Sequence, residues 1–253
     1  MERLVKFADF LTKDPSLPID ITAAVLTGRK RTFSSDSERL AIKFEKPVVL
    51  GAENIPTDPT PVIIACNHPN LYDLAVGTVN ITRIFSRRRR EEGLPGKIRW
   101  MVAQNLVSKG SSPVDQKIVF PAINRALKII HQTYDFIPVP LNYLNPQKRS
   151  KERAIVLFAA RKHLKTSPYS TIGIFPEGDF EQVEPLRDFY GGVGVLCRFI
   201  GTEVTVLPVG IYRSIQNKLA VNFGQILRID PGNNAEEITH SIKTAVKALK
   251  KSK

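Results

Sequence analysis

The sequence predicts an α/β fold in which a mixed, mostly parallel sheet is flanked by helices and carries an N-terminal helical appendage. Short apolar runs rich in β-branched residues, such as 61–66 and 171–175, have the length of buried strands. They alternate with stretches of helical periodicity, which is the pattern of α/β proteins. With 253 residues and 42% hydrophobic content, the chain can build one sizeable core. We therefore expect a helical segment over 1–45 and one α/β domain over 46–253.

Two short helices are expected in the N-terminal segment. Apolar residues recur at helical spacing over 1–13 beside arginine and lysine, which is typical of a basic amphipathic helix. A second helix is expected from Asp20 to Thr27, with Asp20 as its N-cap and Gly28 after its end. The segment either packs on the domain or lies in a membrane interface, and the sequence leaves both alternatives open.

The strand expected at 61–66 leads directly into the sequence NHPNLYD at 67–73, which is an NHxxxxD pattern. His68 lies in the expected turn, and a helix follows it. Five residues of helix place two side chains on nearly opposite faces, so His68 and Asp73 can meet only if the turn folds back. Asn70 and Asp73 also fit a helix N-cap with an acidic residue at N3, a structural role without catalysis.

The strand expected at 171–175 leads into a second motif, FPEG, formed by Phe175, Pro176, Glu177 and Gly178. In open α/β sheets, ligands bind at the carboxyl ends of the strands, so two motifs at that edge can share one crevice. The second motif is equally compatible with an ordinary turn after a strand. Each motif alone is weak evidence for a functional site, whereas the two motifs in this order, each after an expected strand, are strong evidence.

The histidine supplies the chemistry that this pair of motifs suggests. A lipid hydroxyl attacks a thioester poorly until a base removes its proton, and neutral histidine is the best such base near pH 7. In this interpretation His68 is the general base, and Asp73 fixes its tautomer and stabilises the imidazolium. The alternative is that His68 is a half-buried turn histidine with no catalytic role.

Two further helices and a glycine cluster follow along the chain. A polar loop is expected over 145–151, leading into a helix over 153–165. The glycines between 191 and 194 are expected to permit close helix packing. A C-terminal helix is expected to begin at Asn234 in a capping-box-like start with Glu237. Its single apolar stripe consists of Ile238, Ile242, Ala245, Val246 and Leu249.

Charge and cysteine usage narrow the function classes. The net charge of +13 suits an anionic membrane surface, an acidic carrier protein or a polyphosphate. The arginine run 87–90 suggests nucleic acid, but it is expected in an exposed, flexible loop, and no nucleic-acid-binding motif accompanies it. The two cysteines, Cys66 and Cys197, lack metal-ligand spacing, and Cys66 is expected in the core. No metal, cofactor or nucleic-acid partner is expected.

With its NHxxxxD and FPEG motifs, the sequence resembles the glycerolipid acyltransferase family, which includes the lysophosphatidate and glycerol-phosphate acyltransferases. The resemblance runs from about Val48 to Ile229 and includes both motifs. Other segments match the family's lead-in, second strand, second block, fourth block and closing strand, and they lie at 50–56, 98–103, 134–139, 206–211 and 222–226.

The resemblance implies a fold, a reaction and a location. It implies a glycerol-3-phosphate acyltransferase-like fold, with His68 as the general base, Asp73 as its partner, and Phe175 to Gly178 in the acceptor site. Acyl-CoA or acyl-carrier protein donates the acyl group to a lysolipid or other glycerolipid hydroxyl, without a covalent enzyme intermediate. No run of apolar residues is long enough to span a bilayer. A peripheral or monotopic location on the cytoplasmic face of an anionic membrane is therefore expected.

The residues expected to bind a phosphate depart from the family pattern. Phosphate-accepting members follow FPEG with a small hydroxylic residue and an arginine, whereas this chain has Asp179 and Phe180. They also carry an arginine after the second block, where this chain reads PLNY at 140–143. An aspartate repels a phosphate dianion. The acceptor therefore either lacks a simple glycerol phosphate or has its phosphate bound by other cations, for which the candidates are Lys148, Arg149 and Arg187.

Overall fold

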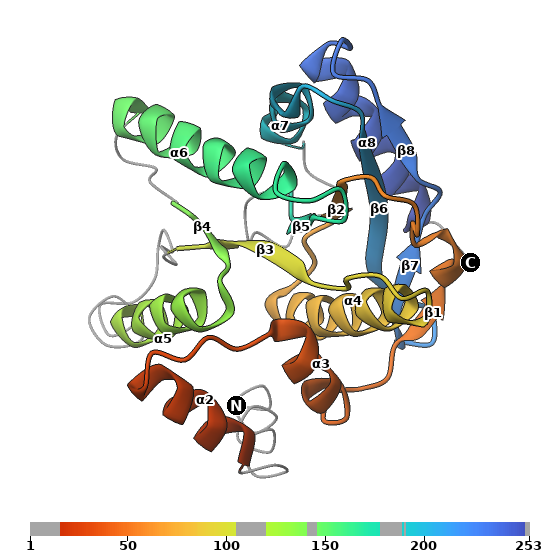
Figure 1. The fold of residues 1–253 in the computed structure, drawn as a ribbon. Helices are drawn as coiled ribbons and strands as arrows, with labels where there is room; N and C mark the ends of the chain where they lie inside the picture. Colours follow the sequence, from red (N-terminus) through yellow and green to blue (C-terminus); the bar gives the residue numbers. More distant parts are fainter. Residues whose placement is uncertain (1–15, 105–119, 141–145, 178–188, 190, 251–253) are drawn as a thin grey trace.

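A computed structural model describes residues 16–104, 120–140, 146–177, 189 and 191–250 (Figure 1). Its centre is an eight-stranded sheet with the order β1-β7-β6-β2-β5-β3-β4, and β8 pairs with β6 beside this path. The strands are β1 (Val48–Leu50), β2 (Val62–Cys66), β3 (Ile98–Ala103), β4 (Ile137–Val139), β5 (Thr171–Ile174), β6 (Val204–Arg213), β7 (Leu219–Phe223) and β8 (Leu227–Ile229). Only the β6–β7 and β6–β8 pairings are antiparallel. The predicted fold class is confirmed.

The middle of the sheet is built on β2, which pairs in parallel with β5 on one side and β6 on the other. All five of its residues are buried, because both faces of the strand are covered by helices. The expected strands at 61–66, 98–103, 171–175 and 206–211 are therefore confirmed to within a few residues. The closing strand is shifted toward the N-terminus of its expected range, since β7 ends at Phe223.

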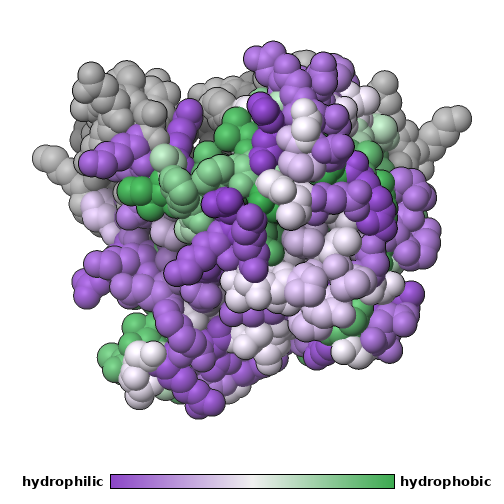
Figure 2. Space-filling model, turned by 45° about the horizontal axis from the view of Figure 1, so that its top comes forward, coloured by the Kyte–Doolittle hydropathy of each residue, from purple (hydrophilic) through white to green (hydrophobic). Residues whose placement is uncertain are grey.

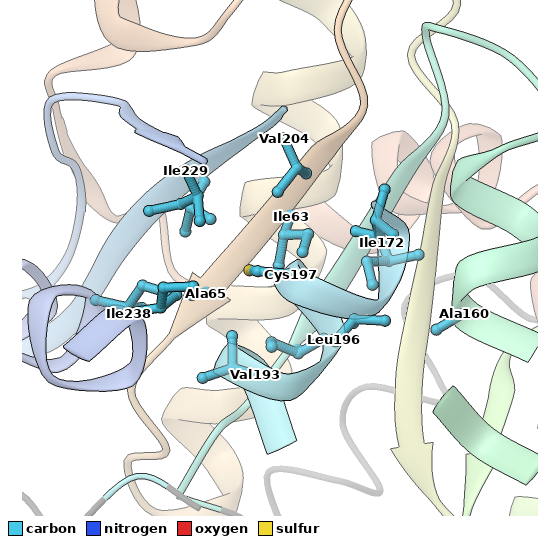
Figure 3. Packing of buried hydrophobic residues seen from close by; sticks show 14 of the residues in the cluster. Ile63, Ala65, Ala160, Ile172, Val193, Leu196, Cys197, Val204, Ile229 and Ile238 are labelled. Atoms are coloured by element: carbon cyan, nitrogen blue, oxygen red, sulfur yellow. The ribbon is translucent and has the colours of Figure 1, made fainter. Parts of the chain in front are cut away.

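Alternate residues of the central strands enter two separate hydrophobic clusters. On one face, Ile63 and Ala65 pack with α6 (Pro146–Leu164), α7 (Gly192–Ile200) and α8 (Ala235–Leu249), as Figure 3 shows. On the other face, Ile64 and Cys66 pack with α4 (Leu71–Glu91) and with Tyr134 of α5 (Phe120–Tyr134). The period-2 alternation of the strands thus yields a three-layer structure.

The helix after the first motif is longer than expected. α4 continues through Glu91, so the arginine run 87–90 lies at its C-terminal end, and the prediction of a flexible loop is wrong. Cations are favoured at a helix C-terminus, and three of the four arginines pair with glutamates. These pairs are Arg87 with Glu91 at 3.1 Å, Arg88 with Glu92 at 2.9 Å and Arg90 with Glu38 at 2.9 Å.

Arg89 differs from its neighbours because it is completely buried. Its guanidinium lies over the rings of Phe85 (5.4 Å) and Tyr169 (5.7 Å). Within the described residues, its side-chain nitrogens have no hydrogen-bond partner. Burial lowers the pKa of Arg89, and the Asp58 carboxylate partly opposes that effect.

The N-terminal segment contains two described helices, α2 (Ser16–Leu26) and α3 (Phe33–Ala41). Asp20 lies inside α2 rather than at its N-cap, because the helix begins four residues earlier, so that prediction is wrong. Gly28 follows the helix end with a φ of +65°, as a left-handed C-terminal residue does. The helix expected over 1–13 lies outside the described residues.

Two more boundaries correct the sequence predictions. α6 begins at Pro146, so most of the expected polar loop 145–151 is helical. Proline fits the first position of a helix because its missing N–H has no partner there in any case. The C-terminal helix begins as expected at Asn234, whose side chain accepts a hydrogen bond from the Glu236 N–H rather than from that of Glu237.

The expected close packing at the glycine cluster holds for one glycine. A Cβ on Gly194 would lie 1.9 Å from the Ala235 carbonyl oxygen of α8, whereas a Cβ on Gly192 would meet no atom within 4 Å.

Both cysteines are buried and free. Burial raises the pKa of the Cys66 thiol, which agrees with its expected core role. Among the described helices, none has the length and apolar character to cross a bilayer.

Gly194→Ala should destabilise the protein because its methyl group forces α7 away from α8. Overpacking of this kind costs about 1–3 kcal/mol, and denaturant unfolding measures it. Gly192→Ala, in the first turn of the same helix, is the matched control and should leave the free energy of unfolding unchanged or slightly higher. Equal stabilities for the two variants would contradict the close contact.

Candidate active site

The two motifs meet at the carboxyl edge of the sheet. β2 ends at Cys66 and β5 at Ile174, and because these strands are parallel neighbours, the turns that follow them lie side by side. The His68 backbone N–H donates a hydrogen bond of 2.7 Å to Oε1 of Glu177, across 109 residues of sequence. Glu177 is 8% exposed, so this charge-assisted bond is largely shielded from water. The expected shared location is therefore confirmed.

The Asn67 side chain fixes the start of the first turn. Its Nδ2 donates to the Ile211 carbonyl at 2.9 Å, and its Oδ1 accepts from the Ile211 N–H at 2.6 Å. The amide thus pairs with β6 in the manner of a further residue of β2. Both groups are buried, so each satisfies polar atoms that water cannot reach.

The imidazole of His68 lies close to a backbone carbonyl and to an aromatic ring. Its Nδ1 lies 3.1 Å from the Pro69 carbonyl oxygen. A carbonyl only accepts, so a hydrogen bond here requires the proton on Nδ1. The ring also meets Phe175 edge-on at 5.6 Å, and Phe175 stacks on Trp100 at 5.3 Å.

Trp100 connects this aromatic contact to the core. Its Nε1 donates to the Thr82 hydroxyl at 2.9 Å. The ring covers Gly173, where a Cβ would lie 2.3 Å from the indole. The side chain that packs against the candidate base is therefore seated on a buried, hydrogen-bonded ring.

The Asp73 carboxylate binds Asn70 and Arg213. Asn70 Nδ2 donates to it at 2.7 Å, and the Asp73 N–H donates to Asn70 Oδ1 at 3.0 Å. Asn70 is thus the N-cap of α4 with Asp73 at N3, so the structural role suggested by the sequence is confirmed. Within the described residues, the hydrogen bonds of this carboxylate go to these two partners and not to His68. The catalytic role of Asp73 stays a prediction.

Arg213, the last residue of β6, joins three segments. Its guanidinium approaches Asp73 Oδ1 to 2.6 Å and Glu45 Oε2 to 3.1 Å, and it donates to the Asn217 carbonyl at 2.7 Å. Hydrogen bonds to the two carboxylates raise its pKa further above the ordinary arginine value. Asp73 has only 5% of its side chain exposed, so the ion pair is its main compensation for burial.

The rest of the predicted site lies partly outside the described residues. Pro176 and Glu177 are buried beside Phe175, while Gly178, Asp179, Phe180 and Arg187 are not described. Lys148 and Arg149 lie in the first turn of α6, and their side chains are not described. Within the described part of the chain, no group of three or more His, Cys, Asp or Glu could hold a metal ion.

Sequence reasoning missed Arg213 and Glu45 and gave Asn67 no function. Neither charged residue belongs to a motif, and they lie 168 residues apart. The available signal for Arg213 is its position, because a charged residue ending an apolar strand that runs parallel to β2 reaches the same edge as His68.

Comparisons with known proteins agree with this architecture. No family model matches the sequence, and no curated protein matches it. Among solved structures, the chain is similar to the 1-acyl-sn-glycerophosphate acyltransferase PlsC from Thermotoga maritima. The TM-score is 0.50 and the identity is 18%, over 98% of this chain and 86% of that one. At this identity, the similarity shows that the two proteins share a fold.

Proposed function

We propose that this protein is an O-acyltransferase that moves a fatty acyl group from a thioester to a hydroxyl of a glycerolipid or lysophospholipid. The observation that carries the proposal is the hydrogen bond between the His68 N–H and Glu177, which joins the two motifs at one sheet edge. The shared fold with a 1-acylglycerophosphate acyltransferase supports the same reaction class. Fold alone does not imply function, so the side chains carry the weight.

In the proposed mechanism, Nε2 of His68 removes the proton from the acceptor hydroxyl. The oxygen attacks the thioester carbonyl and forms a tetrahedral intermediate. The C–S bond then breaks, and the imidazolium returns the proton to the leaving thiolate. The Pro69 carbonyl holds Nδ1–H, so this backbone group fixes the tautomer that general-base catalysis needs. Asp73 acts here through position, since its hydrogen bonds with Asn70 order the turn that carries His68.

The substrates follow from charge and chemistry. The donor is acyl-CoA or acyl-carrier protein, because a chain with a net charge of +13 suits a polyphosphate or an acidic protein. The acceptor is a lysophosphatidate-like lipid or, given Asp179 and Phe180 after Glu177, a lipid without a simple phosphate. The protein works as a peripheral or monotopic enzyme on the cytoplasmic face of an anionic membrane.

A second candidate is a non-catalytic lipid-binding relative. It is favoured by one observation, the commitment of the Asp73 carboxylate to Arg213. A thioester-consumption assay with phosphate-bearing and phosphate-free lysolipids separates the two candidates. Turnover supports the enzyme, and lipid binding without turnover supports the binding protein.

His68→Ala should lower acyl transfer by at least about 10²-fold, because it removes the general base. The thioester assay measures the loss, and circular dichroism checks that the fold remains. His240→Ala removes an exposed histidine of α8 and should keep wild-type turnover. Wild-type turnover in His68→Ala would disprove the mechanism.

Glu177→Ala should slow transfer through loss of the hydrogen bond to the His68 backbone. A hydrogen bond to a charged group contributes about 1.5–3 kcal/mol, which corresponds to roughly 10- to 150-fold in kcat/KM. Glu177→Gln is the matched variant, because its amide oxygen still accepts from the N–H. It should therefore stay much closer to wild type, and equal losses in both variants would show that the carboxylate charge has another role.

Arg213→Met should destabilise the fold, because it leaves Asp73 buried without its cation. Removing one partner of a buried pair costs about 3–5 kcal/mol, and the 29% exposure of Arg213 places the loss near or below the lower end. Arg228→Met is the control, since Arg228 also bridges two carboxylates but is 48% exposed. It should cost clearly less in denaturant unfolding, because water screens exposed ion pairs, and similar losses in both variants would contradict this assignment.

A further inference from the structure

Helix α6 carries large apolar side chains on its outer side as well as its inner side. Val156, Ala160 and Leu164 enter the core, whereas Ile155 and Phe158 are 62% and 59% exposed. On α7, Val195 is 44% exposed. Exposed apolar side chains that gather on one surface indicate a binding site more often than isolated ones do.

The exposed residues of the two helices form one surface. Ile155 and Phe158 are three residues apart on α6 and therefore lie on the same side of the helix. The Phe158 ring meets Phe199 of α7 edge-on at 4.9 Å. Val195 lies one turn before Phe199. We call Ile155, Phe158, Val195 and Phe199 the α6–α7 patch.

Cations border this patch. Lys151 and Lys162 lie four residues before Ile155 and four residues after Phe158, so they extend the same helix stripe at both ends, and both are exposed. Arg198 is exposed on α7, and the Arg161 guanidinium lies 4.6 Å from the centre of the Phe199 ring. In the sequences of α6 and α7, the only acidic residue is the half-buried Glu152. Figure 2, which turns the top of the molecule forward, shows apolar atoms gathered between hydrophilic ones.

An apolar centre with a cationic border complements an anionic bilayer. Apolar side chains enter the interface between headgroups, and each lysine or arginine near the surface adds attraction to anionic lipid. A protein partner of standard interface size needs a broader area than these four side chains offer. The chemistry therefore favours lipid.

The patch also lies on elements that reach the candidate active site. α6 leads into β5 and α7 leads out of it toward β6, and both strands are parallel to β2. Both helices therefore run antiparallel to these strands and begin at the carboxyl edge, where His68 and Glu177 lie. A bilayer against this face brings a lipid acceptor to that edge.

We propose that the α6–α7 patch is the surface by which this protein lies on an anionic bilayer. The inference rests on the proposed lipid acylation, which gives the protein a reason to bind a membrane. Membrane binding itself is measured without turnover. It places the bilayer on the face of the sheet opposite to α2 and α3, which pack with α5 and α4 (Figure 1). The N-terminal helices are then a structural cover of the second face rather than the main lipid contact.

The experiment is cosedimentation of the full chain with vesicles of phosphatidylcholine alone or with phosphatidylglycerol added. The double variant Ile155→Gln/Phe158→Gln should lower partitioning onto anionic vesicles by roughly 10-fold or more, because two large side chains no longer enter the interface. The matched control is Ile19→Gln/Leu26→Gln on α2. Ile19 is 65% exposed and Leu26 is 81% exposed. This control should bind like wild type, and thermal unfolding should show all variants folded.

A second pair of variants tests the cationic border. Lys151→Gln/Lys162→Gln should weaken binding to anionic vesicles by about 5-fold per lysine and leave binding to neutral vesicles unchanged. Lys46→Gln/Lys218→Gln removes the same charge from exposed sites elsewhere and should have a smaller effect.

Two results would overturn the proposal. One is loss of vesicle binding in the α2 control but not in the α6 variant. The other is unchanged vesicle binding in the α6 variant with a selective loss of turnover on acyl-carrier protein, which would assign the patch to an acidic protein. If wild type binds vesicles through the patch but transfers no acyl group, the surface assignment stands and the enzymatic proposal fails.

Discussion

The parallel pairing of β2 with β5 is the constraint on which the candidate site depends. Its register, from Val62 opposite Thr171 to Ala65 opposite Ile174, ends both strands at the same edge. Two turns that are distant in sequence then lie close enough for Glu177 to accept a hydrogen bond from the His68 backbone. A slip by one residue would turn Ile63 and Ile64 to the wrong layers, so the two hydrophobic clusters also maintain the geometry of the site.

Buried polar groups then fix the first turn relative to its neighbours. Asn67 extends the pairing of β2 with β6, and Arg213 draws Asp73 and Glu45 to the end of the same strand. The two buried groups among them, Asn67 and Asp73, each have specific partners, as low-dielectric interiors require. The turn that carries His68 is consequently fixed relative to the strands on both sides.

The N-terminal helices and the α6–α7 patch occupy opposite faces of the sheet, and this separation shapes the proposed membrane orientation. α2 exposes Ile19 and Leu26, so exposure alone does not distinguish the two faces. The distinction comes from arrangement, because Phe158 of α6 contacts Phe199 of α7 and cations border both helices. Charge and apolar surface act together at a lipid interface, which a charge count over the whole chain does not reveal.

The sequence by itself determined the central strands, the start of α4, the C-terminal helix and the pairing of the two motifs at one edge. These features depend on local periodicity, capping and strand length, which neighbouring residues encode. Tertiary structure alone decided the partner of Asp73 and the burial of Arg89. Arg213 reaches Asp73 across 140 residues, and the Arg89 guanidinium lies over the ring of Tyr169 from a distant segment. Such choices depend on which groups the fold brings together, and no local pattern contains that information.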